Sequence, residues 1–385
     1  MRNKHTLRNV RIIDSKAIYE NMRLIRSEIP SDVSVMAVVK ADGYGHGDLT
    51  AARAALFGGA DQLAVASVDE GCRLRAQGVR EPILVLGAVT ESDVLSGVEH
   101  GLTQTVCSPE MVFLCERAGE RLHREAAVHL KVDSGMGRIG VRNAAEFESV
   151  LSALARARHL RLSGVFTHFA DADGNEEGEA YTYQQYRLFQ EMTRSLPEDV
   201  LRHCANSAAI HRYPEMRMNM VRVGISLYGY PPVQTDLRLQ RCMEWKCSVS
   251  YIKEVSDGDF VSYGRTYRAE GTRKIATVTC GYADGYPRCA SGKAAVLIRG
   301  HRVPVVGRIC MDQMMVDITG CDDIETGDET ILMGQDGSDV ITAEDIAGWC
   351  DTISYEILVH TGSRVVRKVI HPDFIEGDRF ADEGK

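Results

Sequence analysis

The sequence predicts an α/β fold in which a (β/α)8 barrel of the TIM type is followed by a mainly-β C-terminal domain. From about residue 30 to 230, eight short apolar segments alternate with longer segments of helical spacing, as in successive βα units. After the proline-containing stretch 230–236, short β-rich segments are separated by Gly-Asp or Gly-His turns, which is typical of an all-β barrel or sandwich. A doubly wound sheet is the competing interpretation of the first part.

The elements follow from the spacing of apolar residues. From Ile18 to Ile29 such residues recur every three or four positions behind Asp14 and Ser15, which predicts a capped helix. The eight expected barrel strands are 35–40, 62–67, 83–87, 103–107, 127–132, 162–168, 202–205 and 220–223. The expected strands of the second part are 247–255, 260–263, 274–280, 294–299, 302–306, 314–318 and 329–333.

The change of pattern predicts two domains. We expect the barrel to occupy residues 1–235 and the β-rich domain residues 236–385. The first strand, about residues 8–14, is expected to pack with the C-terminal domain. The polar, acidic tail from Asp373 onward is expected to be frayed.

Composition limits the classes of function. Lysine and arginine number 45 against 54 aspartate and glutamate, and this net charge of −9 argues against a nucleic-acid partner. The chain has no apolar run long enough to span a membrane and no signal peptide at Met1, so we expect no membrane partner. Its eleven cysteines include no CxxC pair, which favours a cytoplasmic protein with free thiols and no metal site.

Lys40 is the first candidate for chemistry. The apolar run from Val35 to Val39 ends abruptly in this lysine, and a loop with three glycines follows up to Gly47. A lysine at the rim of a buried strand is partly desolvated, which lowers the pKa of its amine and makes it a nucleophile suited to a Schiff base. The alternative is a lysine that merely extends to solvent beside an ordinary βα loop.

Polar residues also follow other predicted strands. Because barrel enzymes bind substrate at the carboxyl ends of their strands, these residues are expected to gather at one site. Any one of them could be a structural group, but their recurrence at five strand ends favours a ligand site. The set is Lys40, Lys131 with Asp133 and Arg138, His168, Asn206 with Ser207, and Arg222 followed by Gly224 and Ile225.

Nine motifs in a fixed order resemble the alanine racemase family of pyridoxal-phosphate enzymes. They span nearly the whole chain, about residues 8 to 368, and read AVVKADGYGHG, KVDSGMGRIG, THFADAD, NSAA, VRVGISLYG, SYGRTY, GYADGYPR, GRICMDQ and ISYE. The resemblance implies an enzyme that interconverts L-alanine and D-alanine with pyridoxal 5′-phosphate and supplies D-alanine for peptidoglycan. It also implies the barrel-plus-β-domain fold and a homodimer whose subunits share their active sites.

The resemblance assigns cofactor contacts residue by residue. Lys40 would hold the cofactor as a Schiff base, and Arg222, supported by His168, would face the pyridine nitrogen. Because arginine stays protonated, it would not readily give that nitrogen a proton, and the ring would be a poorer electron sink. The other implied contacts, mainly to the phosphate, are Tyr44, Asn206, Ser207, Gly224, Ile225 and Tyr355.

The resemblance further implies two bases on opposite faces of the substrate. Lys40 would take the Cα proton of the D-enantiomer, and Tyr263 of a second subunit that of the L-enantiomer. Arg138 and the His168–Arg222 pair are the candidates for stabilising the tyrosine phenolate. The implied substrate contacts are Arg138, Tyr282 and the backbone of Met311, and Lys131 matches a position that is N-carboxylated in some relatives.

Three alternatives stay open. A serine-preferring or broad-specificity racemase of this fold is disfavoured because Tyr355 leaves room for a methyl group and little more. A decarboxylase of similar architecture would carry a Cys-Glu-Ser-Gly-Asp segment, which this sequence lacks. A non-catalytic pyridoxal-phosphate carrier would resemble the barrel alone and would not need the motifs around Tyr263, Tyr282 and Met311.

Overall fold

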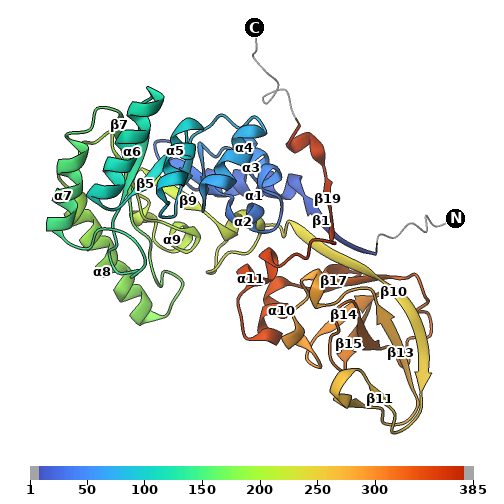
Figure 1. Cartoon of the computed structure of the whole chain (residues 1–385). Coiled ribbons are helices and arrows are strands. Elements are labelled where there is room, and N and C mark those ends of the chain that lie inside the picture. The colour runs from blue at the N-terminus through green and yellow to red at the C-terminus, as the bar shows by residue number, and fades with distance from the viewer. Residues whose placement is uncertain (1–7, 377–385) are drawn as a thin grey trace. The chain divides into compact units, whose positions relative to one another are not determined.

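The computed structural model describes residues 8–376, which form two compact units (Figure 1). One unit contains Ser15–Gln240 and residues 372–376; the other contains residues 8–14 and 241–371. The first strand thus lies in the β-rich unit, with which it was expected to pack, whereas residues 372–376 lie in the barrel unit.

The first unit is a closed barrel of eight parallel strands. Two four-stranded sheets, with the orders β4-β3-β2-β9 and β5-β6-β7-β8, meet at two seams. Thr103 N donates to Ile83 O at 2.9 Å at one seam, and Arg222 N donates to Ala205 O at 3.0 Å at the other. The predicted barrel is confirmed, and the doubly wound sheet is excluded. The strands are β2 (Ser34–Val38), β3 (Gln62–Val65), β4 (Ile83–Val85), β5 (Gln104–Val106), β6 (Ala126–Lys131), β7 (Leu160–Phe166), β8 (Leu201–His203) and β9 (Met220–Val223).

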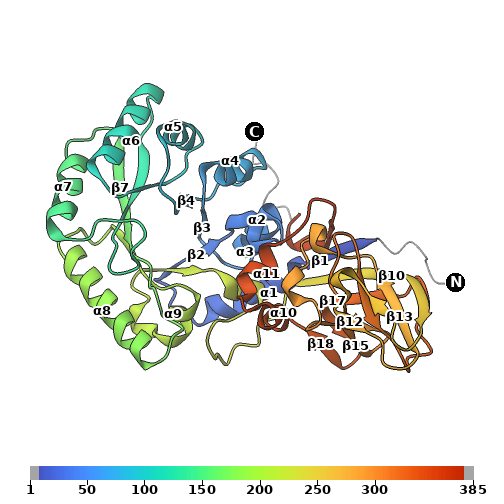
Figure 2. The ribbon, with the colours of Figure 1, turned by 60° about the horizontal axis from the view of Figure 1, so that its bottom comes forward.

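Helices follow the strands along the chain, and Figure 2 shows α5, α6, α7 and α8 in succession outside the strands. Several begin where the sequence places a capping side chain. Ser67 accepts from Glu70 N at the start of α4, and Asn143 accepts from Glu146 N at the start of α7. The helices are α1 (Ser15–Ser27), α2 (Lys40–Tyr44), α3 (Asp48–Phe57), α4 (Val68–Ala76), α5 (Glu91–Glu99), α6 (Pro109–Leu122), α7 (Ala144–Leu154), α8 (Glu176–Thr193) and α9 (Ser207–Arg212), with 3₁₀ turns η1 (Pro214–Met216) and η2 (Ile225–Tyr228).

The chain packs against the barrel again near its C-terminal end. Residues Pro372–Phe374 form the 3₁₀ turn η6, and the Phe374 ring lies 4.9 Å from that of Tyr19. The Arg53 guanidinium donates to Ile375 O at 3.3 Å. The expectation that the chain is frayed from Asp373 onward was therefore wrong for residues 373–376, because the Phe374 side chain packs against the barrel unit. The rest of the predicted tail, residues 377–385, lies outside the described residues.

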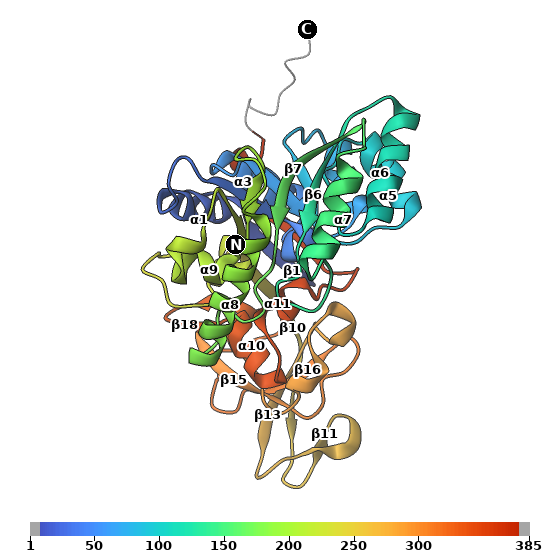
Figure 3. The ribbon, with the colours of Figure 1, turned by 90° about the vertical axis from the view of Figure 1, so that its left-hand side faces the viewer.

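The second unit is built around a ring of six antiparallel strands. β10 pairs with β13, then β16, β15, β14 and β17 follow, and β17 pairs back with β10. The expected all-β domain is thus a closed barrel, and Figure 3 shows its long β10–β13 pair. β1 extends the sheet by pairing antiparallel with β10 and parallel with β19.

The second unit's elements have the following bounds. The strands are β1 (Asn9–Asp14), β10 (Met243–Val255), β11 (Phe260–Val261), β12 (Tyr267–Arg268), β13 (Arg273–Val278), β14 (Ala295–Ile298), β15 (His301–Val306), β16 (Met314–Asp317), β17 (Glu329–Asp336), β18 (Asp339–Ile341) and β19 (Val366–Ile370). The helices are α10 (Ala343–Cys350) and α11 (Ser354–Val359), with turns η3 (Tyr263–Arg265), η4 (Tyr282–Asp284) and η5 (Arg288–Ala290). Among the described residues, no helix has the length and apolar character that a membrane span needs.

Candidate active site

Lys40 stands just beyond β2 at the start of α2, a short segment whose backbone is a tight left-handed turn and not a regular α-helix. The next four residues, Ala41 to Tyr44, have φ values of 53, 56, 59 and 51°. Three of them carry a Cβ atom, for which this conformation costs about 1–2 kcal/mol per residue. The predicted glycine-rich loop is therefore a strained turn. Such strain persists where the surroundings fix the backbone, which is common at functional sites.

Two carboxylates hold this turn in place. Glu70 of α4 accepts from Ala41 N and from Ala66 N, both at 2.7 Å. Asp42 accepts from Asp48 N at 3.0 Å. These bonds connect the turn to α3, α4 and the end of β3, so the position of Lys40 is set by three elements of the barrel.

Gly43 is the one glycine inside the left-handed turn, and it faces α3. A Cβ atom at this position would lie 2.8 Å from the Cβ of Ala51. We expect Gly43→Ala to lower the free energy of unfolding by about 2 kcal/mol, from left-handed strain plus this contact. Denaturant unfolding would measure it. Gly78→Ala is the matched control, because Gly78 has φ +87° but open space around it; an equal loss in both variants would show that the contact with Ala51 costs nothing.

The electrostatic surroundings of Lys40 favour a neutral amine. Burial lowers the pKa of Lys40 most and the positive charge of Arg138 lowers it further; Glu70 opposes this shift, and Arg222 makes the smallest contribution, which also lowers it. A lysine whose pKa is depressed has more neutral amine at neutral pH. This is the state that attacks a carbonyl and accepts a proton.

Arg222 on β9 is buried and bound from several sides. It is 3% exposed, and its guanidinium donates to the backbone oxygens of Thr167, His203 and Cys204 at 2.9–3.2 Å. Its nitrogens also contact Nδ1 of His203 at 3.0 Å and Nδ1 of His168 at 3.3 Å. Burial lowers the pKa of Arg222 to about 10, so the guanidinium remains charged at neutral pH. The result is a rigidly oriented cation among neutral acceptors.

Two histidines that sequence analysis missed extend this network into the barrel. Burial, then the charge of Arg222, holds the pKa of His203 well below its usual range. Since a guanidinium can only donate, Nδ1 of His203 accepts and its Nε2–H points to Nδ1 of His129, 3.0 Å away. Burial lowers the pKa of His129 to about 3, so it is neutral too. A Cβ atom at Gly164 would lie 2.6 Å from the His129 ring, so that glycine provides its space.

Hydroxyl and backbone groups converge on Gly224 at the end of β9. Gly224 N donates to Ser207 Oγ at 2.9 Å, and Ser226 N lies 3.4 Å from the same oxygen. A Cβ atom at Gly224 would lie 3.1 Å from the Tyr44 hydroxyl and 3.5 Å from Ser207 Oγ. Only glycine leaves this space open. Ile225 opens η2 directly beyond it, and together these groups form a donor set suited to a phosphate.

Asn206 contributes to the region around Gly224 by capping the helix that carries Ser207. Its side-chain oxygen accepts from Ala209 N at 3.0 Å and so caps the first turn of α9. Because Ser207 is the first residue of that helix, the cap fixes the backbone from which the Ser207 hydroxyl extends toward Gly224.

Lys131, the last residue of β6, is 2% exposed. Its ammonium nitrogen donates to Val132 O at 2.6 Å and lies 5.3 Å from the centre of the Phe166 ring. Burial lowers the pKa of Lys131 to about 7, and the charge of Arg222 contributes. The neutral amine of Lys131 is thus far more accessible at physiological pH than that of an exposed lysine.

The loop after Lys131 presents Arg138. Asp133, which is 5% exposed, accepts from Gly135 N at 3.1 Å and from Gly137 N at 2.9 Å. This single carboxylate shapes the turn that leads to Arg138. The Arg138 guanidinium lowers the pKa values of Lys40, Lys131 and Arg222 in turn, so it acts on the same site.

The β-rich unit carries the remaining predicted residues. Tyr263, Met311 and Tyr282 are 70%, 52% and 41% exposed, while Tyr355 is half-buried on α11. Tyr282 N donates to Cys310 O at 3.0 Å, which brings the Tyr282 and Met311 segments together. The exposure of Tyr263, Met311 and Tyr282 leaves these side chains accessible to a ligand or another chain.

Arg364 is a further residue that sequence analysis missed. Its guanidinium donates to both oxygens of Asp284 at 2.7 and 3.2 Å, to Asp312 at 2.6 Å and to Met311 O at 3.2 Å. Asp284 is 1% exposed and lies in the same turn as Tyr282. Arg364 therefore clamps the two segments together.

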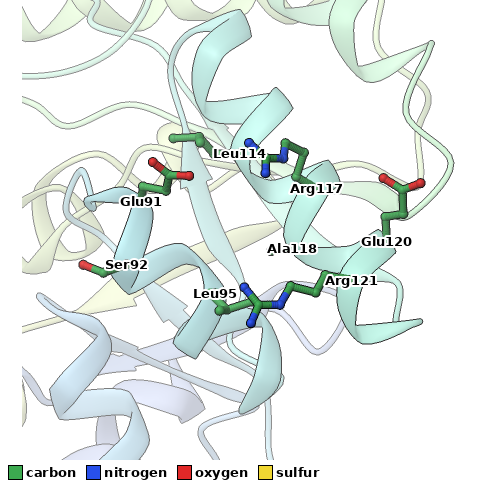
Figure 4. A pocket seen from close by; sticks show the side chains of 8 residues that line it. All are labelled: Glu91, Ser92, Leu95, Leu114, Arg117, Ala118, Glu120 and Arg121. Carbon is green, nitrogen blue, oxygen red and sulfur yellow. The ribbon is translucent and has the colours of Figure 1, made fainter.

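A surface cavity of about 370 Å³ between α5 and α6 is distinct from this site (Figure 4). Leu95 and Leu114 line it together with the charged Arg117, Arg121 and Glu91. None of the predicted site residues is among the residues that line it.

The groups at the barrel's carboxyl end fit pyridoxal phosphate. A desolvated lysine amine suits its aldehyde, the groups around Gly224 suit its phosphate, and the fixed Arg222 guanidinium can donate to its ring nitrogen. We therefore place this unit among the barrel-type pyridoxal-phosphate enzymes.

Comparison with known proteins identifies the particular family. The models of the alanine racemase N-terminal and C-terminal domains match residues 13–232 and 242–369. The alanine racemase of Symbiobacterium thermophilum is 44% identical over 362 residues, covering 92% of this chain and 95% of the relative. The solved alanine racemase of Clostridium difficile 630 is 39% identical with a TM-score of 0.88, covering 95% of this chain and 96% of that one. The chain belongs to the alanine racemase family, whose members depend on pyridoxal phosphate.

One solved structure with the same fold is named for a different amino acid. The histidine racemase of Leuconostoc mesenteroides is 26% identical to this chain with a TM-score of 0.84, covering 94% of this chain and 98% of that one. Fold similarity alone therefore leaves the substrate side chain open.

Proposed function

We propose that this chain interconverts L-alanine and D-alanine with pyridoxal phosphate, using Lys40 and Tyr263 as the two bases. The observation that carries the proposal is the Lys40 amine, with its lowered pKa, on a rigid turn that shares one electrostatic site with Arg222 and Arg138. This combination suits a lysine that both binds a carbonyl cofactor and transfers protons.

Lys40 would hold the cofactor covalently, and the hydroxyls of Tyr44 and Ser207 with the backbone around Gly224 would receive its phosphate. Tyr355 is a further candidate for that contact. When bound, the cofactor withdraws electrons from the substrate and makes its Cα hydrogen acidic. Arg222 would donate to the ring nitrogen without protonating it, which should suppress side reactions such as transamination.

Racemisation needs a proton removed from one face of Cα and returned to the other. We assign the D-enantiomer's proton to Lys40 and the L-enantiomer's proton to Tyr263 of a second subunit. A tyrosine has a pKa near 10 and needs nearby cations to act as a base. Arg138 and the His168–Arg222 pair, joined at 3.3 Å, would supply them.

Arg138 and the Met311 backbone would receive the substrate carboxylate. Tyr282 and Tyr355 would border the substrate side chain, where a bulky tyrosine leaves room for a methyl group. An apolar pocket rejects one added hydroxyl only about 100-fold, so slower turnover of serine is expected.

The chemistry of Lys131 supports an N-carboxylated side chain. Carboxylation requires a neutral amine, and a pKa of about 7 supplies it. It would also replace a positive charge by a negative one beside Arg138 and Arg222. We expect labelled ¹³C-bicarbonate to give a carbamate NMR signal in the wild-type protein that is absent in Lys131→Arg. The same spectrum in both proteins would contradict the assignment.

Two properties follow from the proposed activity. D-alanine made in the cytoplasm would serve peptidoglycan synthesis. A homodimer would cover the exposed side chains of the β-rich unit, which include Tyr263, Phe260, Met311 and Ile353 at 50–70% exposure.

The test is a parallel assay of loss of optical rotation with L-alanine, L-serine and L-histidine, together with the visible absorbance of the bound cofactor. Faster racemisation of alanine than of the other two supports the proposal. A coloured protein that prefers serine or histidine would overturn the substrate, and a coloured but inert protein would favour the carrier.

A further inference from the structure

Ser262, the residue before Tyr263, has a backbone conformation that suits only glycine. Its φ is 70° and its ψ is −178°, a region that residues with a Cβ atom avoid. Glycine would occupy it without strain. The chain nevertheless carries a serine here, so the position stores strain beside the proposed base.

Contacts with the segment after β15 hold Ser262 in this conformation, and its hydroxyl also lies 3.5 Å from the Cys310 sulfur. Its hydroxyl donates to Arg308 O at 2.6 Å, which connects η3 to the segment after β15. Gly307 allows the close approach, because a Cβ atom there would lie 2.7 Å from the Ser262 Cβ and 2.6 Å from Val261 O. The hydrogen bond from the serine hydroxyl therefore ties the residue before Tyr263 to Arg308.

This link joins the two segments that carry substrate-facing groups. Ser262 precedes Tyr263, and Arg308 lies three residues before Met311. A fixed spacing between them matters, because a displacement of about 1 Å in a proton-transfer geometry can cost about 100-fold in rate.

We propose that Ser262 is a positioning residue that fixes the Tyr263 hydroxyl relative to the Met311 segment for proton transfer on the L-face of Cα. The inference rests on the proposed function, in which Tyr263 is the second base. It adds that the strained backbone of Ser262 and its hydrogen bond to Arg308 hold Tyr263 in place for the proton transfer. A residue selected for stability alone would be glycine here.

The test compares two substitutions by thermal unfolding and by racemisation of alanine, both on the cofactor-loaded enzyme. Ser262→Gly removes strain and hydroxyl together, so we expect a melting temperature about 2–4 °C higher and racemisation at least about tenfold slower. Ser262→Ala keeps the strain but loses the link, so both values should fall. In Ser262→Gly, solvent-deuterium exchange at Cα of D-alanine, which needs only Lys40, should be unchanged.

His123→Gly is the matched control. His123 ends α6 with φ 50°, is exposed and lies outside the site, so glycine should raise the melting temperature without changing racemisation. Racemisation by Ser262→Gly at the wild-type rate would overturn the proposal, as would loss of both stability and activity in that variant. If Tyr263→Phe still racemises alanine normally, it is the proposed function that fails; if only Ser262→Gly is normal, this inference alone fails.

Discussion

Tyr263→Phe should slow alanine racemisation by about 10²–10⁴-fold, the usual contribution of one general base. Because the two substrates are mirror images with equal free energies, kcat/KM must fall by the same factor in both directions. The visible absorbance of the bound cofactor should be retained, since Lys40 is untouched. Equal losses of absorbance and activity would contradict the assigned role.

Hydrogen exchange at Cα in deuterated water distinguishes the roles of the two bases in Tyr263→Phe. Without the tyrosine hydroxyl, Lys40 can still remove and return the Cα proton of D-alanine, so that enantiomer should exchange without inverting. L-alanine should exchange far more slowly. Tyr251→Phe is the matched control, because Tyr251 is an exposed tyrosine of β10 in the same unit at 59% exposure; exchange of both enantiomers at similar rates in Tyr263→Phe would remove the two-base assignment.

Lys40→Ala should have the larger effect, since one side chain is assigned two tasks. We expect racemisation to fall by more than about 10⁴-fold and the covalent cofactor absorbance to disappear. Added methylamine should restore part of the activity, because a small amine can occupy the vacated space and accept the proton.

The control for this variant is Lys253→Ala, which removes an exposed lysine of β10 and should change nothing. Full cofactor absorbance in Lys40→Ala after dialysis would show that another amine holds the cofactor. Lys131, with its pKa of about 7, would then be the next candidate.

The barrel and its strand-end residues could be predicted because they leave local signals. The run from Val35 to Val39 that ends in Lys40 predicts a buried strand from only five residues. The eight barrel strands were identified for the same reason, although β5 and β8 are only three residues long.

The left-handed turn after Lys40 had no comparable signal. Ala41 and Asp42 have positive φ in a turn that Glu70 and Asp48, from later helices, hydrogen-bond. Local sequence cannot reveal a conformation that distant residues impose.

The buried histidines and Arg364 escaped for related reasons. A histidine inside a short apolar strand, such as His129 or His203, has the pattern of an ordinary core residue. Arg364 lies 80 residues from Asp284 and 52 from Asp312, so its role exists only in three dimensions.

The crowding of positive charge at the barrel's carboxyl end affects the stability of the protein without its cofactor. The charge of Arg138 disfavours the charged states of Lys40, Lys131 and Arg222, the charge of Arg222 acts in the same way on both lysines, and an anionic phosphate would relieve that repulsion. A ligand that binds only the native state adds about 2.7 kcal/mol of stability at a concentration 100 times its Kd. The supply of pyridoxal phosphate would then govern both how fast the enzyme works and how much of it survives proteolysis, so cofactor depletion would lower the amount of enzyme as well as its activity.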